Sequence, residues 1–222
     1  MVVFNAGPID LLQSSLPGCC ETKIILSKGD LTMHNFVPFN TICDFNTGVL
    51  NPPGNLISRY LSDMRGVFYD RNAYEAMLEE NPKIYEFYNV IIPEEDGHLQ
   101  HCTSIVYPGK VGNEYFMTKG HYHAIPGTAE IYICFRGQGK LVMQTVEGDF
   151  KVLDMYPGSI SYIPPFWAHR TVNVGSEPLV FFGVYRGDAG HNYGTIEEKG
   201  FYKLVIEKNN IPALIDNPHY GR

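Results

Sequence analysis

Thr118-Lys119-Gly120-His121-Tyr122-His123 is the most informative segment of this chain, because it places two histidines two residues apart. Side chains alternate along a strand, so His121 and His123 would point to the same face of a sheet. Two imidazoles side by side repel each other when protonated, which makes the pair a poor choice for a core without a metal. Glu130 and, on a later strand, His169 can add a carboxylate and a third imidazole. The four side chains predict a metal site inside a β-barrel, with open positions for a substrate.

The donor set narrows the choice of metal. Three imidazole nitrogens and one carboxylate oxygen, without a thiolate, suit iron, manganese, nickel, cobalt or zinc. Cys102 and Cys134 lie close in sequence to these donors, and we expect both to be buried structural thiols.

Composition excludes several classes of protein. The 222 residues fit one domain with a sizeable core, and the net charge of -7 argues against binding to nucleic acid or to an anionic membrane. The five cysteines are odd in number and form no C-x-x-C pair, which favours a reducing compartment. The first residues lack the basic start and continuous apolar run of a signal peptide, and no apolar window reaches membrane-spanning length. We therefore expect a cytoplasmic protein.

The chain divides into an N-terminal extension, residues 1–45, which shows no strong period, and a domain at residues 46–222. In the domain, Asp70 is a candidate N-cap for a helix over residues 71–80, which Asn81-Pro82 would end. A further helical turn is expected within residues 55–64. Short segments separated by Gly and Pro turns predict an all-β sandwich or barrel. The expected strands are residues 84–92, 101–107, 129–135, 140–145, 151–155, 159–163, 168–174 and 179–185, with residues 201–206 closing the sheet.

Two spaced motifs carry a resemblance to a known superfamily. His121-x-His123-x6-Glu130-x6-Gly137, followed by Gly158-x5-Pro164-x4-His169-x3-Asn173, resembles the two cupin motifs. The resemblance implies a cupin double-stranded β-helix, a jelly-roll-like barrel with a few short helices, and metal ligation by His121, His123, Glu130 and His169. Two departures stand out: the gap between His123 and Glu130 is longer than usual, and Phe166 replaces the usual glycine of the second motif.

Both departures fit one branch, the cupin-type (archaeal-type) glucose-6-phosphate isomerases. The chain is similar to this family over about residues 46–218, in order and in spacing. The matching segments are Leu61–Met64, Tyr107–Gly112, Thr118–His123, Pro164–Asn173 and Asp188–Thr195. The resemblance implies a metal-dependent aldose–ketose isomerase that interconverts glucose 6-phosphate and fructose 6-phosphate in glycolysis or gluconeogenesis. It also implies one divalent metal per subunit, with iron as the first expectation.

The same resemblance assigns roles to particular residues. Glu130, Tyr132 and His191 are the expected catalytic residues, and proton transfer by a base or a hydride shift between C1 and C2 stay open as alternatives. Thr118, Lys119 and Gly120 offer a hydroxyl, an ammonium and an unhindered backbone NH to a phosphate. The full set of expected substrate contacts is Ser104, Thr118, Lys119, Gly120, Tyr132, Tyr185, His191 and Tyr193.

Two other functions are weighed against the isomerase. A cupin dioxygenase would use the same ligands but an apolar pocket, which Thr118-Lys119-Gly120 and the tyrosines argue against. A non-catalytic sugar-binding cupin would have little use for a full ligand set. The exposed edges of a small antiparallel barrel favour pairing with a second copy, so a homodimer is expected, with residues 1–45 as a candidate for exchange between subunits.

Overall fold

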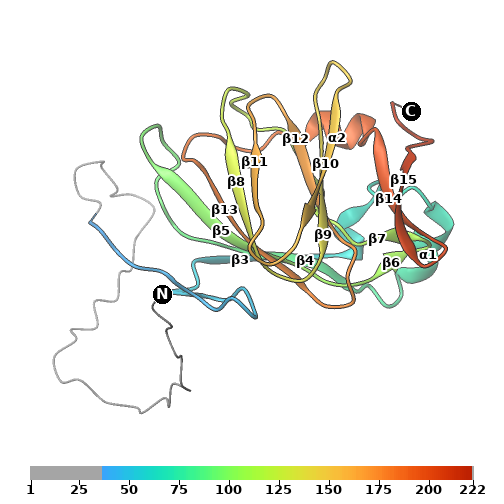
Figure 1. Cartoon of the computed structure of the whole chain (residues 1–222), viewed down its shortest axis with the longest axis horizontal. Coiled ribbons are helices and arrows are strands. Elements are labelled where there is room, and N and C mark those ends of the chain that lie inside the picture. The colour runs from blue at the N-terminus through green and yellow to red at the C-terminus, as the bar shows by residue number, and fades with distance from the viewer. Residues whose placement is uncertain (1–36, 222) are drawn as a thin grey trace, which may run out of the picture. The chain divides into compact units, whose positions relative to one another are not determined.

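The computed structural model describes residues 37–221, and from Pro38 onward they form one compact unit (Figure 1). Most of the predicted N-terminal extension, residues 1–36, lies outside the described residues. A small hairpin of β1 (Ile42–Cys43) and β2 (Leu50–Asn51) lies across the predicted boundary between residues 45 and 46. Within residues 37–221, no helix has both the length and the apolar character needed to span a bilayer.

The largest element is a six-stranded antiparallel sheet with the strand order β11-β8-β13-β5-β4-β3. Its strands are β3 (Asn55–Tyr60), β4 (Lys83–Asn89), β5 (Leu99–Val106), β8 (Glu130–Arg136), β11 (Ile160–Ile163) and β13 (Leu179–Arg186). On β8 the side chains alternate as the sequence predicts: Glu130, Tyr132 and Cys134 are buried, while Ile131 is exposed. This alternation points Glu130 and Tyr132 to the inner face.

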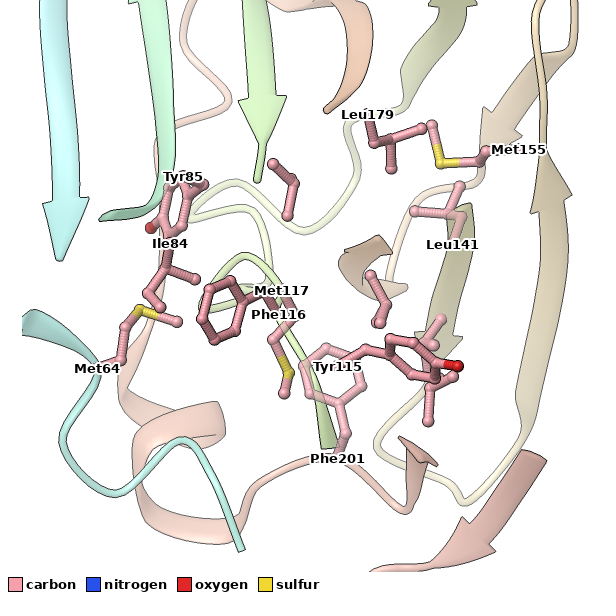
Figure 2. Close-up of a cluster of buried hydrophobic side chains, with 14 of the residues drawn as sticks. Met64, Ile84, Tyr85, Tyr115, Phe116, Met117, Leu141, Met155, Leu179 and Phe201 are labelled. Carbon is pink, nitrogen blue, oxygen red and sulfur yellow. The ribbon is translucent and has the colours of Figure 1, made fainter. Parts of the chain in front are cut away.

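A second antiparallel sheet has the order β10-β9-β12, from strands β9 (Gly139–Gln144), β10 (Phe150–Met155) and β12 (Ala168–Asn173). The segment from Met117 to Tyr122 extends this sheet beyond β12, through isolated bridges between Met117 and Val172 and between His121 and His169. One cluster of buried side chains draws on both sheets, so the core lies between them (Figure 2). The fold is the predicted all-β cupin architecture with few helices.

A third, four-stranded sheet has the order β15-β14-β7-β6 (Figure 1). It comprises β6 (Lys110–Val111), β7 (Glu114–Tyr115), β14 (Lys203–Lys208) and β15 (Ile211–Asp216). The prediction that residues 201–206 close the main sheet is therefore wrong, because β14 pairs with β15 and β7 instead.

The helices are short, and one prediction for them needs correction. Asp70 caps α1 (Arg71–Met77) by accepting a hydrogen bond from the Ala73 N–H at 3.0 Å, as predicted. The expected helical turn at residues 55–64 is confirmed only for the 3₁₀ helix η2 (Leu61–Met64), since residues 55–60 form β3. The pairing of β3 with β4 supplies long-range hydrogen bonds that no local pattern reveals. The last helix, α2 (Gly194–Lys199), precedes β14.

Candidate metal centre

The four predicted ligands converge at one place on the inner face of the barrel. One donor atom each from His121, His123, Glu130 and His169 lies within 4.8 Å of the other three. We call these four residues the ligand cluster. Glu130 opens β8 and His169 is the second residue of β12. His121 and His169 exchange two backbone hydrogen bonds, of 3.2 and 3.1 Å, so the backbone itself sets two of the four side chains against each other.

A threonine orients the second histidine of the cluster. His123 Nδ1 lies 2.7 Å from Thr128 Oγ1 and 3.1 Å from the Thr128 carbonyl oxygen. The Thr128 hydroxyl donates to the Ile125 carbonyl, so its oxygen accepts from His123 Nδ1–H. The Nδ1 proton is therefore held by Thr128, and Nε2, which lies 3.2 Å from Glu130 Oε2, is the nitrogen left to bind a metal once it carries no proton.

Unpartnered buried nitrogens support a cation in this position. His121 Nε2 and His169 Nε2 are buried and make no hydrogen bond of good geometry within the described part of the chain. Glu130 Oε2 lies 3.2 Å from His123 Nε2 and 3.0 Å from His169 Nε2. Buried polar atoms without partners are costly, and a divalent cation would satisfy all of them together.

The electrostatics keep the cluster in a form that can bind a metal. Burial alone would raise the pKa of Glu130, but the close nitrogens of His123 and His169 outweigh it and lower the pKa to about 2. Burial lowers the pKa of His121 well below its usual value, and the neighbouring imidazoles lower it further. At neutral pH Glu130 is therefore an anion and His121 is a neutral donor.

The ligand cluster lies at a pocket that opens to solvent. All of the predicted substrate contacts line this pocket, together with three members of the cluster. The residues concerned are Ser104, Thr118, Lys119, Gly120, His121, Glu130, Tyr132, His169, Tyr185, His191 and Tyr193.

The Thr118–Gly120 stretch forms one wall of the pocket. Thr118 Oγ1 accepts from the Thr171 N–H at 3.1 Å, which leaves its hydroxyl hydrogen able to donate into the pocket. Gly120 has a φ of 77°, and a Cβ at this position would lie 2.6 Å from the Phe201 ring. Only glycine fits here, so the unhindered NH that the sequence suggested is a requirement of the packing as well.

Aromatic rings surround the cluster. The Tyr132 ring meets the His169 ring edge-on, with centroids 5.7 Å apart, and burial raises the pKa of Tyr132 well above its usual value. Tyr132 is therefore a neutral hydroxyl donor. His191 lies 4.4 Å from His121, centroid to centroid, and stacks on Tyr193 with ring planes 11° apart. His191 and Tyr193 are exposed, which puts them at the mouth of the pocket.

Sequence reasoning missed several residues of the site. Tyr85, Phe87, Cys102 and Phe181 also line the pocket. Tyr85 and Phe87 are two apart on β4, so the alternation signals that they share a face, but nothing in the sequence says that the face is this one. Burial raises the pKa of Tyr85 to about 12, so it too is a neutral hydroxyl.

Phe166, which stands where the second motif usually has a glycine, has an unusual backbone conformation. Phe166 has a φ of 72°, in the left-handed region that favours glycine, and its side chain is 62% exposed. The Phe166 N–H donates to the Pro126 carbonyl at 2.8 Å, which holds the turn that leads into β12. Phe166 therefore adopts a backbone conformation that glycine would adopt more easily.

Comparisons with known proteins point in one direction. The family model described as Glucose-6-phosphate isomerase (GPI) matches residues 58–219. A glucose-6-phosphate isomerase of Thermococcus gammatolerans is 50% identical over 184 residues, which is 83% of this chain and 97% of that protein. The corresponding protein of Pyrococcus furiosus is 48% identical over 186 residues, 83% of this chain and 98% of that one. Among solved structures, an oxalate decarboxylase of Lactobacillus farciminis is similar with a TM-score of 0.40 and 19% identity, over 49% of this chain and 30% of that one, a likeness too weak to indicate function.

Proposed function

The chain belongs to the glucose-6-phosphate isomerase family, and on this premise we propose that it interconverts glucose 6-phosphate and fructose 6-phosphate at the ligand cluster. One observation carries the proposal: the four metal donors converge, and three of them line the same pocket as a stretch that can bind a phosphate, Thr118–Gly120. We propose residues 46–222 as the isomerase domain.

We assign the metal to His121, His123, Glu130 and His169. A divalent metal bound there would polarise the two sugar oxygens, at C1 and C2, between which hydrogen is transferred. Iron is our first choice, with manganese, nickel, cobalt and zinc as the others that this donor set accepts. His169→Ala should abolish metal binding and activity together while the barrel stays folded. The exposed His219→Ala variant is the control, and unchanged metal content in His169→Ala would contradict the assignment.

The chain's own groups divide into those near the reacting carbons and those near the phosphate. Glu130, the ionised carboxylate of the ligand cluster, is the proposed base. The neutral hydroxyl of Tyr132 and the imidazole of His191 can donate to sugar oxygens as charge develops on them. The proposed phosphate and sugar contacts are Ser104, Thr118, Lys119, Gly120, Tyr185 and Tyr193. Deuterium placed at C2 of glucose 6-phosphate separates the two routes: loss to solvent supports proton transfer by a base, and retention supports a hydride shift.

The deciding experiment measures formation of glucose 6-phosphate from fructose 6-phosphate by chelated and by metal-reloaded protein. Turnover that disappears on chelation and returns with one of the five metals supports both the site and the reaction. A folded protein that binds metal and fructose 6-phosphate without turnover would instead support a sugar-binding cupin.

We also propose that the protein is a homodimer. The outer face of β8 and β11 carries Ile131, Ile160 and Tyr162, which are 39%, 70% and 57% exposed. Apolar side chains gathered beside the free edge of β11 favour contact with a second copy. Ile160→Glu should give a monomer by light scattering, while Ile211→Glu on β15, at a side chain of similar exposure, should leave the mass unchanged. A monomeric unaltered protein would refute the proposal.

A cytoplasmic location is proposed as well. Cys43, Cys102 and Cys134 are free thiols in the described part of the chain, while Cys19 and Cys20 lie outside it. Free thiols suit a reducing compartment.

A further inference from the structure

Arg170 is a buried cation beside the ligand cluster, and the proposed reaction gives it no role. It follows His169 on β12 and is 4% exposed. Because side chains alternate along a strand, Arg170 points to the face opposite His169 and away from the ligands. Burying a guanidinium is costly unless it is well paired, so its surroundings should show what it does.

The guanidinium of Arg170 forms two hydrogen bonds to a single backbone carbonyl. Arg170 Nε and Nη2 both donate to the Lys119 carbonyl oxygen, at 3.1 and 2.6 Å. The guanidinium carbon lies 4.5 Å from the centroid of the Phe201 ring, which fixes the plane of the fork. Glu114, fully buried on β7, is a carboxyl group that attracts the guanidinium when it is ionised. Two donors on one oxygen, with a ring behind them, leave the carbonyl little freedom to turn.

Fixing this carbonyl also fixes the next backbone N–H. In a trans peptide the C=O and N–H bonds point in opposite directions, so a Lys119 carbonyl held by Arg170 aims the Gly120 N–H the other way. Gly120 lines the pocket of the ligand cluster, and within residues 37–221 its N–H makes no hydrogen bond. A backbone donor without a partner at a pocket wall is ready to bind an anion.

We propose that Arg170 is a positioning residue that orients the Lys119–Gly120 peptide, so that the Gly120 N–H binds the phosphate of the substrate. This inference rests on the proposed function for the phosphate-binding role of Thr118–Gly120. Arg170 itself does not touch the substrate. Its loss should weaken phosphate binding and leave the metal and the chemistry at C1 and C2 in place.

The test uses the full chain, loaded with metal, as Arg170→Met and Arg170→Lys variants. Arg136→Met is the matched control, because Arg136 also donates to a backbone carbonyl, that of Asn46, but does not line the pocket. The measurements are KM and kcat for fructose 6-phosphate, metal content, and the Kd of inorganic phosphate by calorimetry. For Arg170→Met we expect KM and the phosphate Kd to rise about tenfold, kcat to change by less than about threefold, and metal content to stay unchanged. Arg170→Lys keeps the charge but lacks the paired N–H donors of the guanidinium, so its KM and phosphate Kd should lie between those of Arg170→Met and the unaltered protein. Arg136→Met should have the KM and phosphate Kd of the unaltered protein.

Each result that differs from these expectations contradicts either the positioning role of Arg170 or the proposed function. If KM and the phosphate Kd of the variants equal those of the unaltered protein, Arg170 does not position the peptide. If kcat and metal content fall together with phosphate affinity, Arg170 is merely structural. If Arg170→Met does not fold, Arg170→Lys decides alone, and unchanged phosphate affinity in it refutes the inference. If the unaltered protein turns over no fructose 6-phosphate, the proposed function fails, while the calorimetric comparison with inorganic phosphate still tests Arg170.

Discussion

At the scale of single residues, the metal site depends on a group that is not a ligand. Thr128 fixes the tautomer of His123, and its own hydroxyl is held by the Ile125 carbonyl. The convergence of the four donors could be predicted, because the spacing of His121 and His123 and the position of Glu130 on an apolar strand are local patterns. Thr128 could not, because its contact depends on the conformation of the loop between the two ligand segments.

Thr128→Val should weaken metal affinity by about tenfold, because the carbonyl of residue 128 still accepts from His123 Nδ1 while the hydroxyl is lost. A competition titration against a chelator measures the change. Thr145→Val removes another buried threonine hydroxyl, one that accepts from the Asp149 N–H, and should leave metal affinity unaltered. Equal affinities for the two variants would mean that Thr128 does not orient the ligand.

Phe166 offers a second test at a single position. Its φ of 72° is strained for any residue with a Cβ. Phe166→Ala and Phe166→Gly both remove the ring, but only glycine relieves the backbone. We therefore expect Phe166→Gly to have a free energy of unfolding about 1 kcal/mol higher than Phe166→Ala in urea denaturation. A higher value for the alanine variant would show that the turn is not strained.

At the scale of elements, the Thr118–His121 segment joins the proposed phosphate contacts to the ligand cluster. It pairs with β12 through backbone bonds on both sides of Arg170, those of Thr118 with Thr171 and of His121 with His169. The sequence predicts every strand of the two main sheets except β3, because alternation and Gly-Pro turns mark them. It does not predict β3, because its partner β4 is distant in sequence. It does not predict the membership of β14 either, because β14 pairs with the distant β7 as well as with the adjacent β15.

Gly120→Ala tests how tightly this segment is packed. Gly120 and Gly66 have the same φ of 77°, but a Cβ at Gly120 meets Phe201 at 2.6 Å and one at Gly66 meets nothing within 4 Å. Both alanine variants therefore have the same backbone strain, but only Gly120→Ala also has a clash with Phe201. Gly120→Ala should cost about 1–3 kcal/mol more stability than Gly66→Ala and should raise KM for fructose 6-phosphate. Equal stability losses would show that Phe201 yields without cost.

At the scale of the whole molecule, stability should depend on a carboxyl group that is not part of the ligand cluster. Glu114 is fully buried on β7, its Oε2 accepts from the Tyr69 N–H, and burial raises its pKa from 4.5 to about 7. Between pH 4.5 and about 7, Glu114 therefore keeps its proton in the folded protein but has lost it in the unfolded chain. The free energy of unfolding contributed by Glu114 therefore falls as pH rises from about 4.5 to about 7.

Glu114→Gln removes this dependence. Relative to the unaltered protein, the variant should gain stability as pH rises through that window, by up to about 3 kcal/mol at pH 8. Denaturant titrations of both proteins at several pH values measure the difference, which cancels the effects of all other carboxylates. A difference that stays constant with pH would mean that Glu114 is ionised in the folded state throughout.

The distribution of the ligand cluster along the chain has a consequence for biosynthesis. His121, His123 and Glu130 lie within ten residues of one another, but His169 follows much later in the chain, on β12. The backbone of His169 forms the two hydrogen bonds that hold His121 in place. A nascent chain still attached to the ribosome before β12 emerges offers three ligands without the geometry of four. A metal at the ligand cluster would therefore find its complete donor set only after β12 has been made.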